Sequence, residues 1–383
     1  MIYLDNSATT KPCQAALFAM RDALETDWFN PSAAYGPAVR AEKKMTQARK
    51  TLLDAAGAQN AELTFTGSGS EADSLAILGS AERFHGVRRV LLFGGEHPAV
   101  LNTRAQLERL GHTVEVFPAR RDGVADLEKL AAMLDENVGL VSCMQVNNET
   151  GAVQPVEEIA KLVHEKCPQA LMHVDGVQGF LRVPMAFDKS DVDLYTCSGH
   201  KIHGPKGIGA LIARRGVRLS PRIEGGGQEK GLRSGTENTA GIAGFAAAAE
   251  WMLAQTERGE ALRAAKLRLY ARLRAEIPSL HVNGPDPEGK DAAPHILNLS
   301  LGVRGEVMLH ALEAEGVYVG NGSACSTHKR EMSAAFKAMR AEKQDAEMAV
   351  RFSLGMMNTT GEMDAAADAV IRCYKMYSAF QRR

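Results

Sequence analysis

The fold is indicated most clearly by the stretch Leu194-Tyr195-Thr196-Cys197-Ser198-Gly199-His200-Lys201-Ile202-His203-Gly204-Pro205-Lys206-Gly207-Ile208-Gly209-Ala210-Leu211-Ile212. Its two ends, 194–197 and 208–212, are short apolar runs of strand length, and a polar loop rich in Gly and Pro lies between them. Similar runs alternate with segments of helical periodicity from about residue 60 to 215, which is typical of an α/β fold with a mainly parallel sheet. The other strand candidates are 90–93, 114–117, 140–146 and 171–174.

Helical periodicity and a change in composition predict two domains. The segment from 236 to about 255 is Ala-rich and apolar nearly all round, so we expect a buried helix, and the charged run 257–260 after it marks a domain boundary. The turn-rich residues 283–287 lead into a smaller α+β region. We therefore expect a large domain over 14–257 and a small domain formed by 1–13 and 258–383. Two one-faced helices are expected around Val156, Ile159, Ala160 and Val163, and around Leu262, Ala265, Leu269 and Leu273.

Composition excludes several classes of protein. The chain of 383 residues has 45 Lys and Arg against 46 Asp and Glu, and no segment gathers enough basic residues to bind a nucleic acid backbone. No window approaches about 18 uninterrupted apolar residues, and the N-terminal residues lack the pattern of a secretion signal. We expect a cytoplasmic protein with no membrane partner. Its six cysteines are widely spaced and form no C-x-x-C pair, so neither a disulfide framework nor a metal site is expected.

Lys201 and Asp175 are the residues that most clearly point to chemistry. Each follows a predicted strand, and the carboxyl ends of parallel strands form the usual ligand site of an open α/β fold. A lysine and a carboxylate that converge there match what pyridoxal phosphate requires, namely an amine for its aldehyde and an acid for its pyridinium nitrogen. The alternatives are that Lys201 is a solvated lysine in a turn and that Asp175 caps a helix.

A second candidate is Thr66-Gly67-Ser68-Gly69-Ser70-Glu71, which leads into a predicted helix. Small residues at a helix start allow backbone N–H groups to approach a phosphate, and the helix dipole favours the anion. The alternative is a helix that is simply capped by a serine, with Glu71 in its first turn.

Several motifs in register make the chain resemble the cysteine desulfurases of the NifS/IscS type. This resemblance implies a fold type I pyridoxal-phosphate enzyme that works as a homodimer. Such an enzyme converts L-cysteine to L-alanine and keeps the sulfur as a persulfide on its own cysteine. The motifs are Tyr3-Leu4-Asp5-Asn6-Ser7-Ala8-Thr9-Thr10, Asn30-Pro31-Ser32, Val146-Asn147-Asn148-Glu149-Thr150-Gly151, His173-Val174-Asp175-Gly176-Val177-Gln178, Ser198-Gly199-His200-Lys201, Gly231-Leu232-Arg233-Ser234-Gly235-Thr236-Glu237-Asn238, Gly322-Ser323-Ala324-Cys325 and Val350-Arg351-Phe352-Ser353.

The resemblance assigns roles around the cofactor, pyridoxal 5'-phosphate. Lys201 bonds to its aldehyde, Asp175 faces its ring nitrogen, and Asn148 and Gln178 lie near its phenolic oxygen. His97 stacks on the ring and relays protons, unless it is merely a capping or core histidine before Pro98. The phosphate is assigned to Gly69, Ser70, Ser198 and His200, and to Thr236 of the other subunit.

The substrate and sulfur-transfer roles fall on the C-terminal part of the chain. Arg351 matches the arginine that binds the substrate carboxylate, and the alternative for it is a surface salt bridge. The resemblance also assigns Asn148 to substrate binding. Cys325, between small polar residues, matches the nucleophile, whereas the other five cysteines are expected to be small buried hydrophobic residues. The long interval from Cys325 to Arg351 resembles the class that donates sulfur directly to an acceptor protein, such as an iron-sulfur scaffold.

Two other kinds of function are compatible with parts of this pattern. A selenocysteine lyase or a small-amino-acid aminotransferase of the same fold would share Lys201 and Asp175, but an aminotransferase would have no use for Cys325. An inactive relative that binds a sulfur-transfer partner is disfavoured because Lys201, Asp175 and Cys325 are all present.

Overall fold

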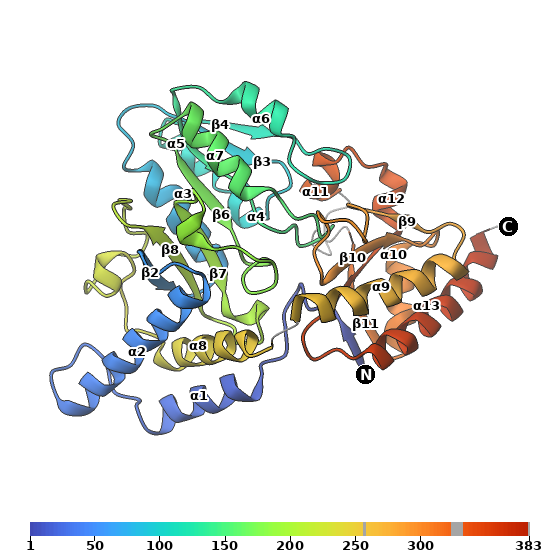
Figure 1. The fold of residues 1–383 in the computed structure, drawn as a ribbon, viewed down its shortest axis with the longest axis horizontal. Helices are drawn as coiled ribbons and strands as arrows, with labels where there is room; N and C mark the ends of the chain where they lie inside the picture. Colours follow the sequence, from blue (N-terminus) through green and yellow to red (C-terminus); the bar gives the residue numbers. More distant parts are fainter. Residues whose placement is uncertain (256–257, 323–331, 382–383) are drawn as a thin grey trace.

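The structure, a computed structural model, describes residues 1–255, 258–322 and 332–381 and contains two β-sheets with helices around them (Figure 1). The larger sheet has seven strands in the order β2-β8-β7-β6-β5-β3-β4, and the smaller has five in the order β1-β11-β12-β10-β9. The predicted α/β class is therefore confirmed. No helix among the described residues is both long and apolar enough to span a lipid bilayer.

The larger sheet is mainly parallel, with one exception that its connection explains. Strands β7, β6, β5, β3 and β4 run parallel, whereas β8 is antiparallel to both β7 and β2. The loop between β7 and β8 is too short for a crossover helix, so the chain can only return antiparallel. The strands are β2 (Ala61–Thr66), β3 (Arg89–Phe93), β4 (Thr113–Phe117), β5 (Val138–Ser142), β6 (Leu171–Asp175), β7 (Leu194–Ser198) and β8 (Gly209–Arg214).

All six strand predictions correspond to strands, with two differences. The strand expected over 140–146 ends at Ser142, and Val146 instead forms an isolated bridge with Val153. Strand β2 was not among the predicted strands, because its sequence AELTFT alternates apolar and polar residues and so contains no continuous apolar run like those of the other strands.

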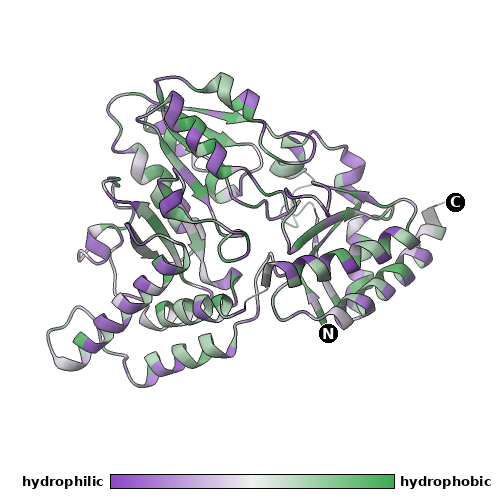
Figure 2. Cartoon of the chain, viewed as in Figure 1, coloured by the Kyte–Doolittle hydropathy of each residue, from purple (hydrophilic) through white to green (hydrophobic). Residues whose placement is uncertain are grey.

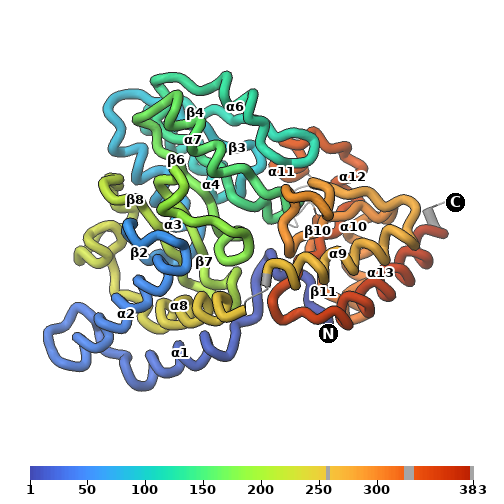
Figure 3. The backbone as a smooth tube through the Cα atoms, viewed as in Figure 1, coloured from blue at the N-terminus to red at the C-terminus, as the bar shows by residue number. Residues whose placement is uncertain are grey.

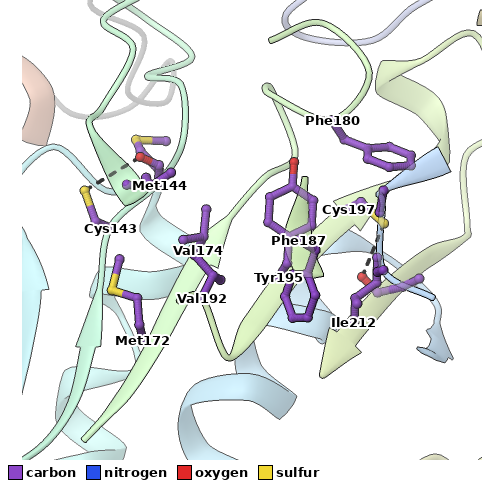
Figure 4. Close-up of a cluster of buried hydrophobic side chains, with 14 of the residues drawn as sticks. Cys143, Met144, Met172, Val174, Phe180, Phe187, Val192, Tyr195, Cys197 and Ile212 are labelled. Atoms are coloured by element: carbon purple, nitrogen blue, oxygen red, sulfur yellow. Dashed lines mark hydrogen bonds between the residues drawn. The ribbon is translucent and has the colours of Figure 1, made fainter. Parts of the chain in front are cut away.

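Helices cover both faces of the larger sheet. On one face, α1, α2, α7 and α8 pack in one core with β6 and β7, and on the other face α3 and α5 pack against β3, β5 and β7. Figure 4 shows part of the first core, where Val174 of β6 lies beside its register partner Tyr195 of β7. These helices are α1 (Gln14–Glu25), α2 (Gly36–Ala55), α3 (Gly69–Ala81), α4 (Pro98–Leu101), α5 (Arg104–Arg109), α6 (Leu127–Met133), α7 (Val156–Lys166) and α8 (Thr239–Leu253).

Helix α8 is the buried helix expected over 236–255, but it begins later. The Asn238 side chain accepts a hydrogen bond from the Gly241 N–H at 2.9 Å and so caps the helix, which leaves Thr236 exposed in the preceding loop. The helix is apolar all round because α1 and α2 pack against it on one side and the sheet core on the other. Burial of a side chain such as Phe245, which is fully buried, stabilises the fold by about 1.5–3 kcal/mol.

The smaller sheet joins the N-terminus to the C-terminal third of the chain. Strand β1 (Ile2–Leu4) pairs in parallel with β11 (Val317–Asn321), which brings the N-terminal segment beside residues far away in sequence (Figure 3). The sheet also contains β9 (His281–Val282), β10 (Ile296–Ser300) and β12 (Ala349–Ser353). The helices of this part are α9 (Arg258–Glu276), α10 (Gly305–Ala314), α11 (Ala334–Ala338), α12 (Lys343–Met348) and α13 (Thr360–Gln381).

Helix α9 carries the predicted apolar stripe. It contacts α13, and both helices pack in one core with the smaller sheet. Figure 2 shows hydrophilic and hydrophobic residues alternating along both helices, as expected for helices with one face on a core and one in water. The stripe residues Leu262, Ala265, Leu269 and Leu273 are all buried.

After β1, the chain passes from the smaller sheet to the loop after β7. The Thr10 N–H donates to the His200 carbonyl oxygen at 2.9 Å, and the Cys13 N–H donates to that of His203 at 2.8 Å. This segment therefore closes over the carboxyl ends of β6 and β7, where the predicted site lies.

Candidate functional site

Lys201 lies directly after β7, at the end of a short 3-10 turn (Gly199–Lys201). Its Nζ donates hydrogen bonds to the carbonyl oxygens of Ser7 at 2.5 Å and Ala8 at 2.8 Å. Burial, together with the positive charges of Arg182 and Arg351, lowers the pKa of Lys201 to about 7. A large fraction of the amine is therefore neutral near neutral pH, and the alternative of a solvated lysine in a turn is wrong.

Asp175 ends the neighbouring strand, β6, and is buried. Its Oδ1 accepts a hydrogen bond from the Val177 N–H at 2.9 Å, so it caps a turn instead of the helix of the alternative interpretation. Burial raises the pKa of this carboxyl, while the Val177 N–H and the nearby His97 and Lys201 oppose the rise. Asp175, His97 and Lys201 thus lie close enough to shift one another's pKa values.

His97 combines a capping role with a place in this group. Its Nδ1 accepts a hydrogen bond from the Ala99 N–H at 3.1 Å at the start of α4, which places the proton of a neutral ring on Nε2. Although its surface remains exposed, the surrounding protein lowers its pKa by desolvation; Asp175 opposes this effect and Lys201 adds to it. The imidazole is therefore held in its neutral form.

The start of α3 forms a tightly packed cradle beside these strand ends. A Cβ on Gly69 would lie 2.7 Å from Val177 Cγ2 and 3.5 Å from Ser198 Cβ, and a Cβ on Gly209 would lie 2.5 Å from the Ser68 carbonyl carbon. Ser68 Oγ accepts the Glu71 N–H at 3.1 Å, so the Ser-capped helix of the alternative interpretation is present. The N–H groups of Gly69 and Ser70, by contrast, have no hydrogen-bond partner among the described residues. They remain available to an anion.

Of the other residues assigned to the phosphate, Ser198 packs against this cradle, and His200 follows Ser198 two residues later in the chain. Ser198 Oγ donates to the Ile208 carbonyl oxygen at 3.5 Å, and His200 Nδ1 lies 3.2 Å from Thr9 Oγ1. Burial lowers the pKa of His200 to about 4, with Lys201 contributing. Thr236 is exposed in the loop before α8, and no hydrogen bond joins it to the other site residues in the described part of the chain.

Gln178 is held by hydrogen bonds on both ends of its amide. Its Nε2 donates to the Ser7 carbonyl oxygen at 2.9 Å, and its Oε1 accepts from Arg182 Nη1 at 2.9 Å. The Ser7 carbonyl oxygen therefore accepts hydrogen bonds from both Gln178 and Lys201, so these two side chains lie next to each other.

Arg351 lies on β12 and is buried, so the alternative of a surface salt bridge is wrong. Its Nη2 donates to Asp5 Oδ1 at 2.6 Å and its Nη1 to the Asn148 carbonyl oxygen at 3.0 Å. Its Nε is buried and has no hydrogen-bond partner among the described residues. The guanidinium thus uses only part of its five N–H donors in these two hydrogen bonds, and a planar guanidinium with donors to spare suits a carboxylate ligand.

Cys325 lies outside the described residues, but the residues on either side of that segment contact the site. Ser333 Oγ donates to Glu149 Oε2 at 2.5 Å, and Asn298 Nδ2 donates both to the Glu149 carbonyl oxygen and to the Gly322 carbonyl oxygen. Burial raises the pKa of Glu149 to about 7, while Ser333 and the charge of Arg351 oppose the rise. Both borders of the segment are thus anchored next to Asn148 and Arg351.

The other five cysteines, as predicted, are buried and free: Cys13, Cys143, Cys167, Cys197 and Cys373. Burial raises the pKa of thiols such as Cys143 and Cys197, which makes them poor nucleophiles.

Three residues that contribute to the site were not predicted from the sequence with a role of their own. Ser7 acts through its backbone carbonyl, which carries no sequence signal. Asp5 pairs with Arg351 from the opposite end of the chain, and Arg182 is an isolated arginine in a non-periodic stretch. The spacing of Arg182 four residues after Gln178 is the sole hint, and it is weak outside a helix.

Comparisons with known proteins find similar proteins over nearly the whole chain. The family model described as "Aminotransferase class-V" matches residues 2–366. The chain is 39% identical to a "NifS/IcsS protein homolog" of Lactobacillus delbrueckii subsp. bulgaricus, over 99% of this chain and 98% of the relative. It is 38% identical to a "Cysteine desulfurase" of Trichormus azollae, over 97% and 92% of the two chains. A solved structure of a "NIFS-LIKE PROTEIN" superposes with a TM-score of 0.91 at 32% identity, over 98% of this chain and 99% of that one.

Proposed function

Because the chain belongs to the aminotransferase class-V family and is a cysteine desulfurase, we propose that it works with pyridoxal 5'-phosphate joined to Lys201. The observation that carries this proposal is the amine of Lys201, whose pKa is lowered to about 7 at the carboxyl edge of the sheet, beside the buried Asp175. A neutral amine attacks an aldehyde, whereas an ammonium group does not.

The residues present fit this cofactor. The free N–H groups of Gly69 and Ser70 and the positive end of α3 suit a phosphate, together with Ser198 and His200. Asp175 is suited to bind the ring nitrogen of the cofactor, and His97 is suited to stack on one face of the ring. The second N–H of Gln178 Nε2, together with Asn148, suits the phenolic oxygen.

The chain's own groups then have distinct tasks. When bound, the cofactor supplies a ring that accepts electrons from the substrate. With the cofactor bound, Asp175 would hold the proton on the ring nitrogen. The neutral Lys201 amine, set free when the amine of L-cysteine takes its place on the aldehyde, would take the substrate α-proton. His97, with its proton on Nε2, can pass a proton on to the departing product.

Sulfur transfer uses Cys325. Its thiolate attacks the substrate sulfur, the substrate C–S bond breaks, and an S–S bond forms on Cys325 Sγ. A proton replaces the sulfur on carbon, so one L-cysteine yields one L-alanine and one persulfide. Alanine, sulfide and protein-bound persulfide, measured together after addition of L-cysteine, test this function.

Arg351→Ala should weaken binding of L-cysteine far more than binding of the cofactor. Loss of a charge-assisted contact to the substrate carboxylate costs about 2 to 3 kcal/mol, roughly a 30-fold to more than 100-fold increase in KM. The matched control is Arg372→Ala, which removes an exposed ion pair with Glu315. An unchanged KM combined with loss of bound cofactor would assign Arg351 to the wrong ligand.

We also propose that the protein is a homodimer in the cytoplasm that passes sulfur to an acceptor protein, such as an iron-sulfur scaffold. Aromatic side chains exposed after α1 support an interface. Trp28 stacks on Phe29 at 4.3 Å between ring centroids and remains 64% exposed, and Tyr35 packs edge-on against Phe29. The five free cysteines are compatible with a reducing compartment.

If Thr236 completes the phosphate site of the other subunit, variants should complement each other. A heterodimer of one Lys201→Ala subunit and one Thr236→Ala subunit, purified through two different tags, has one site with both residues intact. We expect about half of the wild-type activity per dimer, because each dimer contains two equivalent sites.

Both parental homodimers serve as controls and should be much less active. If Thr236 served its own chain, the heterodimer would have no intact site and would show no recovery. An active monomer in sedimentation would contradict the shared site directly.

A further inference from the structure

Arg182 is a buried cation for which the described part of the chain offers no carboxylate partner. It is 6% exposed, its Nη1 donates to Gln178 Oε1, and its Nη2 has no hydrogen-bond partner within 1–255, 258–322 and 332–381. Burial lowers its pKa to about 9, so the guanidinium still carries its charge at neutral pH. An unpaired buried charge is costly to the fold, so its presence calls for a functional reason.

A short chain of hydrogen bonds leads from Arg182 to Lys201. A guanidinium can only donate, so the Gln178 carbonyl oxygen must face Arg182 and its NH2 group must face the opposite way. That NH2 group donates to the Ser7 carbonyl oxygen, which also accepts from Lys201 Nζ. Arg182 thus determines which end of the Gln178 amide faces the lysine.

The charge of Arg182 also acts on Lys201. After burial, it is the largest influence that lowers the pKa of this lysine, followed by Arg351, and Asp5 and Asp175 oppose both. His97 and His200 also face Lys201, and both are held neutral.

We propose that Arg182 is a positioning residue of this site: it fixes the orientation of the Gln178 amide, and its charge keeps Lys201 in the neutral, nucleophilic form. The inference rests on the proposed role of Lys201. Arginine suits this task because it retains its charge when buried, whereas a buried lysine readily loses its proton.

The test uses the full-length chain freed of cofactor. Lys201 is acetylated with acetic anhydride at a series of pH values, and the extent of acetylation is measured by mass spectrometry of the Lys201 peptide. The wild type should show a midpoint near pH 7. In Arg182→Met the midpoint should rise by about one pH unit, because a nearby positive charge has been removed. Arg182→Lys should return the midpoint only in part, because a lysine buried at this position readily loses its proton and with it the charge.

Lys266→Met is the matched control. Lys266 is also a buried cation that donates to a carbonyl oxygen, that of Ala293, but it lies on α9 and is not among the charges that shift the pKa of Lys201. Its removal should leave the Lys201 midpoint unchanged, and thermal unfolding should verify that each variant is folded.

Gln178→Leu provides a second route if Arg182→Met does not fold, because it breaks the hydrogen-bond chain but keeps the charge. Its Lys201 midpoint should stay near that of the wild type, while its affinity for pyridoxal phosphate should fall about tenfold through the lost hydrogen bond. A midpoint that rises in Gln178→Leu, or one that stays unchanged in a folded Arg182→Met, would overturn the proposal. The acetylation needs no bound cofactor, so its result stands apart from any failure of the proposed function.

Discussion

Replacing Cys325 by Ala is expected to abolish the formation of alanine from L-cysteine, with a loss on the order of 10³-fold or more, while the cofactor stays joined to Lys201. Sulfur leaves carbon poorly unless a thiolate accepts it, and the other five cysteines are buried. The yellow colour of the loaded protein should therefore persist in the variant, which shows that the cofactor site is intact. Cys373→Ala, a buried cysteine of the small-sheet core, is the matched control and should remain active.

Selenocysteine distinguishes a desulfurase from a lyase in the same variant. A selenol is more acidic than a thiol and its bond to carbon is weaker, so selenium can leave without a protein nucleophile. Cys325→Ala should therefore keep much of its alanine release from selenocysteine. If the variant turned over cysteine at the wild-type rate, Cys325 would not be the nucleophile. If the variant lost its activity on both cysteine and selenocysteine, Cys325 would have a further role such as proton transfer.

Replacing Lys201 by Ala is expected to remove the covalent link to the cofactor and to reduce turnover by about 10³-fold or more, because one side chain both bonds the aldehyde and moves the α-proton. The cofactor should then be lost on dialysis much faster than from the wild type. Borohydride reduction followed by peptide mapping measures the link directly.

Lys206→Ala is the matched control for this variant. Lys206 lies in the same loop but is exposed, so its removal should leave both the link and the turnover unchanged. A reduced adduct on Lys206, or on any lysine other than Lys201, would contradict the assignment.

The sequence predicts the part of the fold that periodicity controls. Strands β3 to β8 of the larger sheet and the helical stripe of α9 follow from apolar spacing, because a buried face must repeat at the period of its element. Two features escaped this reasoning. Strand β2 has no continuous apolar run, because the polar Thr64 and Thr66 are buried beside its apolar residues, and the start of α8 depends on the side-chain cap at Asn238.

The site, like the fold, contains residues that the sequence predicts and residues that it does not. Lys201 and Asp175 were predictable because each ends a strand, and the sheet places the ends of β6 and β7 side by side. The Asp5–Arg351 ion pair and the contact of Arg182 with Gln178 depend on tertiary packing between distant segments, for which local sequence contains no signal. Cys325, the predicted nucleophile, lies outside the described residues, so its role stays a prediction.

One measurement tests the central claim most directly. The purified, cofactor-loaded protein is mixed with a single equivalent of L-cysteine, quenched, and analysed both for alanine and for the mass of the Cys325 peptide. We predict one alanine for each sulfur atom gained by Cys325. Alanine without added sulfur on Cys325, or a keto acid in place of alanine, would contradict the account.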